Sequence, residues 1–239
     1  MRTVIIPLAG NSSRFFNAGY NIVKYKLPLF NSKPLLWHIL SYINREFKII
    51  IVLNLKFDDK NWIKNLLTKL GFKLFEIVEI EDTDGQLTSV KLGILNSKII
   101  ELYDELIVYN GDTIRHVPFD LNFNGSDGVI EVFDQEGDHW SFVNEIGQVS
   151  LVTEKKRISN YCSTGLYGFK TIDLFLKFSN KVKLTNDEKY IAPIYNELIK
   201  EKLKVTSFLT DNSCFSLCGT PQEYEFTRNL RCNNYLNNK

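Results

Sequence analysis

The feature that most constrains the fold is an alternation, in the first half of the chain, between short apolar runs and longer amphipathic segments. The apolar runs, rich in Ile and Val, fall at residues 4–8, 48–54, 73–80 and 105–109. Between them, apolar residues recur at helical spacing after Pro34, at 62–70 and at 87–95. Short apolar runs that alternate with amphipathic helices predict a mostly parallel sheet covered by helices.

The pattern changes at Gly128. Further strands are predicted at 129–133, 142–145, 149–153, 163–169 and 205–209, and helices at 172–178, at 193–200 and after Pro221. Tight turns such as residues 146–148 favour an antiparallel region. We predict one α/β domain over residues 1–239, with a parallel half at 1–127, an antiparallel region within 128–230 and a polar tail at 231–239 that frays.

Composition excludes several classes of protein. The chain has 29 basic and 28 acidic residues, so it lacks the basic excess that binding to nucleic acid usually needs. Its apolar runs are shorter than a signal h-region or a membrane span, which predicts a cytoplasmic protein without a membrane partner. Four cysteines lack paired zinc spacing and are expected to be reduced packing residues.

The first predicted strand leads into a loop of small and polar residues, which extends over residues 9–23. From the last residue of the strand onward, the sequence reads Leu8-Ala9-Gly10-Asn11-Ser12-Ser13-Arg14. Small residues at the carboxyl end of a parallel strand let backbone N–H groups approach phosphate, and hydroxyls and a guanidinium add donors. Lys24, Lys26 and Lys33 follow, so this region is expected to meet a polyphosphate.

A second polar turn closes the strand at residues 105–109. It reads Asn110-Gly111-Asp112 and places one carboxylate at the rim of the sheet. Mg²⁺ prefers oxygen ligands and typically takes one or two protein carboxylates, with waters and phosphates as its other ligands. Asp112 is therefore a candidate ligand for Mg²⁺.

These pieces resemble the nucleotidyltransferases that activate sugar phosphates. The resemblance runs, in the family's order, through residues 8–14, 23–25, 32–36, 85–90, 110–113, 154–156, 163–167 and 218–224. It implies a Rossmann-like three-layer α/β/α fold of the GT-A-like nucleotidyltransferase type. It also implies that residues 1–127 bind a nucleoside triphosphate and that residues 128–230 bind a phosphorylated acceptor.

The resemblance also implies roles for individual residues. Arg14 and Lys24 are the expected catalytic cations, and Asp112 is the expected Mg²⁺ ligand. The nucleotide-binding residues implied are Leu8, Ala9, Gly10, Asn11, Ser12, Ser13, Gln86, Ser89, Asn110 and Gly111. The acceptor-binding residues implied are Glu154, Lys155, Thr164 and Gly165.

The chain departs from the family pattern at several positions. Asn11 and Ser12 replace two loop glycines, and both prolines of a P-K-P segment are missing, which leaves Lys26 as a rival to Lys24. Many relatives have a metal-binding aspartate two positions before the glycine of Gly219-Thr220-Pro221, where this chain has Leu217. Either phosphate oxygens complete the metal site or another carboxylate, such as Asp211, does so. Gln86 has an alternative role as a cap of its own helix.

The expected reaction joins a nucleoside triphosphate to a phosphorylated metabolite and releases pyrophosphate. A sugar 1-phosphate used for surface polysaccharide precursors is the first expectation, and a cytidylyltransferase acting on a phosphocholine-like compound is the second. Trp140 and Tyr161 are expected either to face one of these acceptors or to belong to the core. Two further alternatives are a glycosyltransferase that uses Asp82-Thr83-Asp84 and a nucleotide-binding module without catalysis. A homodimer that docks through the second halves is also possible. The nucleotidyltransferase hypothesis requires Arg14 and Asp112 to face one cleft.

Overall fold

The computed structural model describes residues 1–118 and 121–236, and for residues 231–236 it describes the backbone alone. Its centre is a sheet of ten strands within these residues, eight of them in the order β3-β2-β1-β4-β10-β6-β11-β8, with β7 and β9 joined beside β10. The strands of this sheet are β1 (Arg2–Leu8), β2 (Lys48–Asn54), β3 (Phe75–Ile80), β4 (Glu105–Tyr109), β6 (Gly128–Asp134), β7 (Ser141–Val143), β8 (Gly147–Gln148), β9 (Val152–Glu154), β10 (Tyr161–Phe169) and β11 (Val205–Leu209).

The first-half strands pair in parallel, as the apolar runs predict. Strand β1 lies between β2 and β4, and β2 pairs with β3. Strand β10 then pairs antiparallel with both β4 and β6, whereas β11 pairs parallel with β6. The two halves of the chain therefore contribute strands to one mixed sheet, and the α/β fold class is confirmed.

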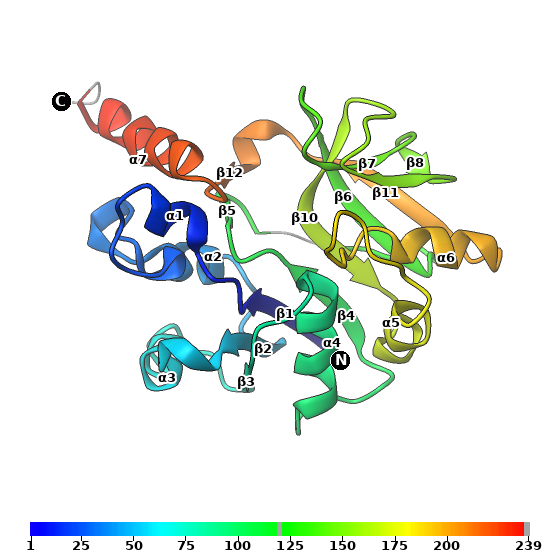
Figure 1. The fold of residues 1–239 in the computed structure, drawn as a ribbon, viewed down its shortest axis with the longest axis horizontal. Helices are drawn as coiled ribbons and strands as arrows, with labels where there is room; N and C mark the ends of the chain where they lie inside the picture. The colour runs from blue at the N-terminus through cyan, green and yellow to red at the C-terminus, as the bar shows by residue number, and fades with distance from the viewer. Residues whose placement is uncertain (119–120, 237–239) are drawn as a thin grey trace.

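Helices cover both faces of this sheet. The α-helices are α1 (Ser13–Asn17), α2 (Leu35–Ser41), α3 (Lys60–Lys69), α4 (Gln86–Asn96), α5 (Ile172–Ser179), α6 (Ile194–Lys200) and α7 (Pro221–Leu236). In Figure 1, α1, α2 and α3 lie to the left of the sheet and α5 and α6 to the right.

The faces follow from the alternation of side chains along each strand. Val4 and Ile6 of β1 pack in one buried cluster with the apolar face of α2 and α3. Ile5 packs in the other cluster, which includes apolar residues of α4, α5 and α6. Because both faces of the central strands are buried, their sequences read as continuous apolar runs.

Several short elements differ from the sequence prediction. Helix α1 lies in the loop predicted as irregular, and strands β5 (Thr113–Arg115) and β12 (Phe215–Leu217) form a small antiparallel sheet that was not predicted. Residues 147–148, predicted as part of a turn, pair with β11 instead. The backbone is helical up to Leu236, so α7 extends into the polar tail predicted at 231–239, and residues 237–239 lie outside the described residues.

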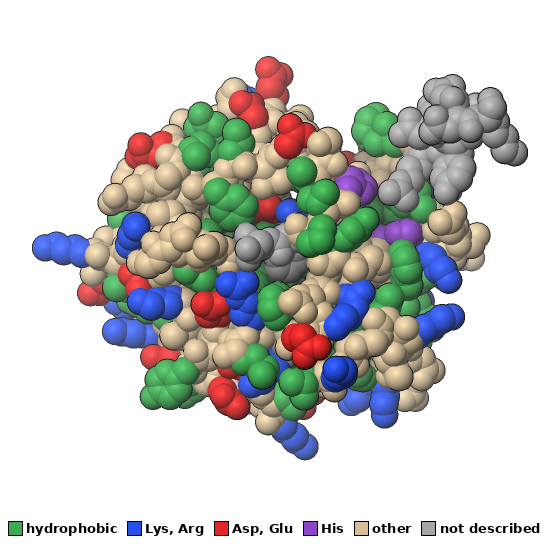
Figure 2. Space-filling view, turned by 180° about the vertical axis from the view of Figure 1, so that it is seen from behind, with side chains coloured by type: hydrophobic (Ala, Val, Ile, Leu, Met, Phe, Trp, Pro, Cys, Tyr) green, Lys and Arg blue, Asp and Glu red, His purple; other side chains and the backbone are tan. Residues whose placement is uncertain are grey.

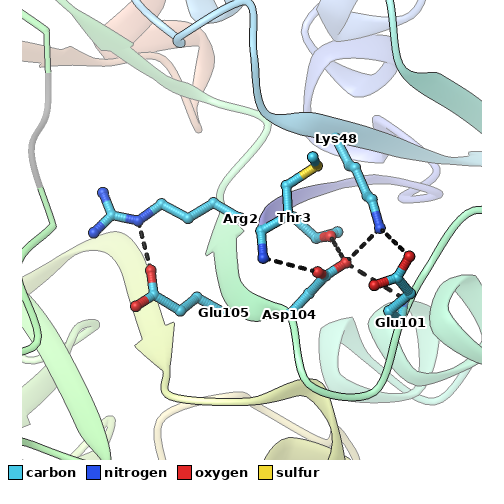
Figure 3. Close-up of polar contacts among 7 residues, drawn as sticks. Arg2, Thr3, Lys48, Glu101, Asp104 and Glu105 are labelled. Atoms are coloured by element: carbon cyan, nitrogen blue, oxygen red, sulfur yellow. Dashed lines mark hydrogen bonds and ion pairs between the residues drawn. The ribbon is translucent and has the colours of Figure 1, made fainter.

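A buried ion pair lies at the amino-terminal end of the parallel strands (Figure 3). Lys48 Nζ lies 2.8 Å from Oδ2 of Asp104, and the hydroxyl of Thr3 donates to the same oxygen at 3.1 Å. The amino group of Met1 lies 3.2 Å from Oδ1 of Asp104. This cluster joins β1, β2 and the turn before β4.

The charges on the surface and the state of the cysteines match what the composition predicts. On the face shown in Figure 2, Lys and Arg side chains lie among Asp and Glu side chains. No helix within the described residues has the length and apolar character needed to cross a membrane. Cys162 and Cys218 are buried free thiols, Cys214 is half-buried and also free, and the side chain of Cys232 lies outside the described residues.

Candidate active site

A cavity of about 590 Å³ opens at the carboxyl ends of β1 and β4. This is the edge at which open α/β sheets bind ligands. All thirteen residues that the sequence implies for the nucleotide side and the metal line it: Leu8, Ala9, Gly10, Asn11, Ser12, Ser13, Arg14, Lys24, Gln86, Ser89, Asn110, Gly111 and Asp112.

A second cavity of about 260 Å³ adjoins the first. Three of the four residues implied for the acceptor line it, namely Glu154, Lys155 and Thr164. The two cavities share part of their walls. Residues common to both are Arg14, Gln86, Asn110, Asp112, Glu188 and Gly219. The two cavities are therefore neighbours, and the arginine and the aspartate line both.

Gly165, the fourth residue implied for the acceptor, has a different position. It is not among the residues that line either cavity. Its carbonyl accepts from the backbone N–H of Asn110 at 2.9 Å, and its φ is +88°. A Cβ there would lie 2.4 Å from the Asn110 side chain, so the glycine lets β10 pack closely on the turn after β4.

The loop after β1 turns sharply at Ser12. This residue has a φ of 53° and a ψ of 22°, a left-handed conformation that favours glycine. Its side-chain oxygen accepts from the backbone N–H of Lys24 at 3.1 Å. The serine that replaces a family glycine thus adopts a glycine-like conformation and joins the loop to the lysine segment.

The structure separates the two rival lysines. Lys24 Nζ lies 2.9 Å from Oδ2 of Asp112, inside the first cavity. Lys26 instead forms an ion pair with the buried Asp59, which also accepts from the hydroxyl of Tyr25 at 2.7 Å, and its ammonium lies 5.2 Å from the ring centroid of Trp62. Lys26 is not one of the residues that line these two cavities.

Asp112 lies in the turn between β4 and β5. The backbone carbonyl of Asp112 accepts from the N–H of Cys218 at 2.8 Å, which fixes the turn against the end of β12. The preceding Gly111 packs so closely on Leu8 that a Cβ would lie 2.3 Å from Cδ2 of that side chain. The turn after β4 is therefore in direct contact with the end of β1.

Gln86 is the first residue of α4. Its Nε2 donates to Oδ1 of Asn110 at 2.5 Å, so its amide faces the cavity wall and does not cap its own helix. The hydroxyl of Ser89 donates to the carbonyl of Gly85 at 3.2 Å and lies 2.7 Å from that of Thr83. The wall formed by the start of α4 is therefore held by side-chain hydrogen bonds.

The second cavity is rich in carboxylates and aromatic rings. Burial raises the pKa of the Glu154 carboxyl, although the hydroxyl of Ser141, which donates to it, acts in the opposite direction. Lys155 Nζ contacts the hydroxyl of Tyr190 and lies 3.6 Å from Oε2 of Glu188. The carboxylates of this cavity are Asp112, Glu154, Glu188 and Glu223, and its large rings are Trp140, Tyr167 and Tyr190.

Glu188 and Tyr190 were missed by the sequence reasoning, and of the two alternatives for Tyr161 the structure shows the core position. The missed residues belong to a segment that folds back from the second half of the chain onto the turn before α4, where the N–H of Lys189 donates to the carbonyl of Asp84 at 2.8 Å. This segment has no periodic pattern that predicts such a contact. Tyr161 packs beside the second hydrophobic cluster and lines neither cavity.

The segment Asp82-Thr83-Asp84 also lines the first cavity, but both carboxylates already have partners. Asp82 accepts from the amide of Asn54 at 2.7 Å, which is the main cause of its lowered pKa. Asp84 lies 2.9 Å from Nζ of Lys189. The two aspartates are therefore held by partners from different segments, Asn54 and Lys189.

Comparison with solved structures identifies proteins of the same architecture. No protein-family model and no curated protein matches the chain. The structure of the nucleoside-diphosphate-sugar pyrophosphorylase from Vibrio cholerae RC9 is 34% identical, with a TM-score of 0.87 over 94% of this chain and 99% of that one.

Two more distant structures share the fold. A UDP-glucose pyrophosphorylase in complex with UDP-glucose is 16% identical, with a TM-score of 0.76 over 98% of this chain and 99% of that one. The inositol-1-phosphate CTP transferase of T. maritima is 15% identical, with a TM-score of 0.71 over 95% of both chains. The likeness thus extends over nearly the whole chain, in line with the fold built above.

Proposed function

The chain belongs to the nucleoside-diphosphate-sugar pyrophosphorylases, a family of nucleotidyltransferases, and we propose that it joins a nucleoside triphosphate to a sugar 1-phosphate. One observation carries this proposal: Arg14 and Asp112 line both of two adjoining cavities. A triphosphate in the larger cavity and a phosphate in the smaller one would meet beside these two residues.

The reaction proposed is an in-line displacement at the α-phosphorus. A phosphate oxygen of the acceptor forms a bond to this phosphorus, the bond from it to the bridging oxygen breaks, and pyrophosphate leaves with that electron pair. No protein nucleophile is needed. Negative charge accumulates on the phosphoryl oxygens, so the rate depends on positioning and on nearby cations, here the guanidinium of Arg14 and the ammonium of Lys24.

A divalent metal ion fits this site. Asp112 supplies a carboxylate oxygen, the ligand type that Mg²⁺ prefers, and Gly219 leaves open the space beside Oδ2 of Asp112 that a Cβ would fill at 3.1 Å. We propose that Asp112 holds Mg²⁺, which would neutralise phosphate charge and orient the triphosphate when bound. Arg14 and Lys24 then stabilise the oxygens that face the protein.

The smaller cavity offers groups that suit a sugar phosphate. The ammonium of Lys155 can bind the acceptor phosphate in place of Glu188, its present partner. The Glu154 carboxyl and the hydroxyls of Ser163 and Thr164 can bind sugar hydroxyls. Production of nucleotide sugars for surface polysaccharide is the role that we propose for this activity.

A second acceptor class is favoured by one specific observation. Four carboxylates in the smaller cavity outnumber its two cations, Arg14 and Lys155, and aromatic rings lie among them. Carboxylates and rings together suit a cationic head group. A cytidylyltransferase acting on a phosphocholine-like compound is therefore the alternative proposal.

The experiment that tests the proposal is a matrix of the four nucleoside triphosphates against phosphorylated acceptors, with pyrophosphate as the readout. The acceptors are hexose 1-phosphates, phosphocholine and the corresponding unphosphorylated compounds. Pyrophosphate that depends on one triphosphate, one sugar 1-phosphate and Mg²⁺ supports the first proposal, whereas release with CTP and phosphocholine alone supports the second. Sugar transfer from a finished nucleotide sugar, without pyrophosphate release in any pair, would overturn both.

A further inference from the structure

Residue 217 is a leucine, at the position where the family resemblance implies a metal-binding aspartate. Leu217 is the last residue of β12, pairs with Thr113 in β5 and lines the acceptor cavity. Its side chain has no oxygen to offer a cation. The site therefore has Asp112 as its one carboxylate from the turn after β4, and a second carboxylate must come from another part of the fold if one exists.

Asp211, the substitute considered from the sequence, does not reach the site. Its Oδ1 accepts from both the backbone N–H and the hydroxyl of Ser213, at 2.8 and 2.6 Å, and these bonds lower the pKa of the carboxyl. It is exposed and lies among the residues of neither cavity. It is the cap of a short 3-10 turn at residues 212–214.

Glu223 does reach the site. It lies in the first turn of α7, and its carboxylate extends back over Gly219 toward the turn that holds Asp112. The position that a Cβ of Gly219 would occupy lies 3.1 Å from Oδ2 of Asp112 and 3.3 Å from Oε2 of Glu223. The two carboxylates thus face one space, which stays open because residue 219 has no side chain.

The carboxylate of Glu223 is also held in place. Its Oε2 accepts from the backbone N–H of Thr220 at 2.9 Å, and the hydroxyl of Thr220 accepts from the N–H of Glu223 at 3.2 Å. This reciprocal pair is a capping box at the start of α7. A carboxylate has two oxygens with several acceptor sites, so the cap leaves capacity for a cation.

We infer that Glu223 is the second protein carboxylate of the divalent cation site, in place of the aspartate that residue 217 lacks. The inference rests on the proposed function, in which Asp112 holds the ion. Two protein carboxylates, with waters and substrate phosphates as the other ligands, match the preference of Mg²⁺. Lys24 offsets the charge of Asp112 in the structure, and a shared divalent cation would offset the charge of both carboxylates.

The test measures Mn²⁺ binding to the free protein by electron paramagnetic resonance, a readout that does not depend on turnover. Glu223→Gln is the informative variant, because a glutamine keeps the capping hydrogen bond and loses the charge. Glu225→Gln is the matched control on the same helix, where the carboxylate accepts from Tyr20 at 2.5 Å and pairs with Arg228 at 2.7 Å. Asp112→Asn and the double variant with Glu223→Gln complete the set.

We expect Glu223→Gln to weaken Mn²⁺ binding at least about tenfold and Glu225→Gln to leave Mn²⁺ binding unchanged. In the Asp112→Asn background, Glu223→Gln should weaken Mn²⁺ binding little further, because both carboxylates bind one ion. Equal binding by Glu223→Gln and the unmodified protein, while Asp112→Asn binds weakly, would overturn this inference and leave the proposed function intact. Equal effects of the two glutamine variants would also overturn it. Unchanged binding by Asp112→Asn would refute the metal assignment of the proposed function, and this inference with it.

Discussion

At the scale of single residues, the site places a cation and a carboxylate in contact where a triphosphate would bind. Lys24 and Asp112 are 21% and 29% exposed, so both remain accessible to a ligand while they pair with each other. Arg14 lines the same cavity. The charges that the proposed phosphoryl transfer would use therefore lie together in this cavity.

We predict that Asp112→Asn and Arg14→Ala each reduce turnover by about a hundredfold or more. Removal of one preorganised electrostatic contact costs about 3 kcal/mol of barrier, and about 1.4 kcal/mol corresponds to tenfold in rate. Pyrophosphate release at saturating substrates measures the effect, and thermal unfolding by circular dichroism shows that the variants remain folded. Turnover close to that of the unmodified enzyme in a folded Asp112→Asn variant would refute the role of this carboxylate.

The two rival lysines give a matched pair of variants. Lys24→Met should reduce turnover about a hundredfold, because it removes a cation from the cavity proposed to bind the triphosphate. Lys26→Met should keep turnover per folded molecule and cost about 1–3 kcal/mol of unfolding free energy, because the buried Asp59 loses its ion-pair partner. Steady-state rates and urea unfolding measure both quantities, and the opposite pattern would make Lys26 the catalytic lysine.

The residues of the candidate site that the sequence predicts are those near the ends of strands, because the strand ends determine their position. The loop after β1, the turn after β4 and the start of α4 all lie at one edge of a parallel sheet, so their residues converge once the strand order is known. Glu188, Tyr190 and Glu223 reach the site from segments distant in sequence. Their positions depend on tertiary packing, for which a single sequence without periodic pattern gives no signal.

At the scale of elements, the contact between the turn before α4 and the segment before α6 joins the two halves of the chain. Gly85 has a φ of +138° and a ψ of 177°, a conformation almost confined to glycine. A Cβ there would lie 2.5 Å from both N and O of Lys189. The backbones of the two segments can approach this closely only because residue 85 has no side chain.

We therefore predict that Gly85→Ala destabilises the protein by about 1–3 kcal/mol or more and weakens nucleotide binding, because the adjacent Gln86 must move. Gly10→Ala is the control for stability, since nothing lies within 4 Å of its Cβ position. Denaturant unfolding and calorimetric titration with the nucleoside triphosphate measure the two effects. Equal stability of the two alanine variants would contradict the role given to Gly85.

The elements that the sequence failed to predict are short and depend on their partners. Strands β5 and β12 have three residues each and exist through pairing with each other, across about a hundred residues of sequence. Strand β8 has two residues, and its glycine, Gly147, is typical of the turn that was predicted. By contrast, β2 and β4 were predicted at their observed bounds, because continuous apolar runs buried on both faces give a clear signal.

At the scale of the whole molecule, the candidate site and a buried ion-pair cluster lie at opposite ends of the parallel strands. The candidate site lies at the carboxyl ends of the parallel strands, and the Asp104 cluster lies at their amino ends (Figure 3). Lys48 and Asp104 are 8% and 1% exposed, so their ion pair is buried. The cluster joins strands of the core, and within the described part of the chain none of its residues lines either cavity.

We predict that Asp104→Asn costs about 3–5 kcal/mol of unfolding free energy at neutral pH, because it leaves the Lys48 ammonium buried without its charge partner. The substitution should leave kcat unchanged. Burial alone would raise the pKa of Asp104, but Lys48, the amino group of Met1 and Thr3 together hold the pKa below its usual value. The carboxylate's contribution is thus complete above the unfolded pKa of about 3.9 and is lost as pH falls through the folded pKa. Urea unfolding of both proteins from pH 7 to pH 3 should show the stability difference shrinking with acid, and a difference that is constant or grows would contradict this account.

The most direct test of the central claim follows the phosphorus atoms of the triphosphate. The enzyme is incubated with Mg²⁺, the acceptor and a triphosphate labelled with ³²P at either the α or the γ position. We predict that the α label appears in a nucleotide-sugar product and that the γ label appears in pyrophosphate, in equal amounts and only when both substrates are present. Transfer of the γ label to the acceptor, or release of the α label as free nucleoside monophosphate, would contradict nucleotidyl transfer by this site.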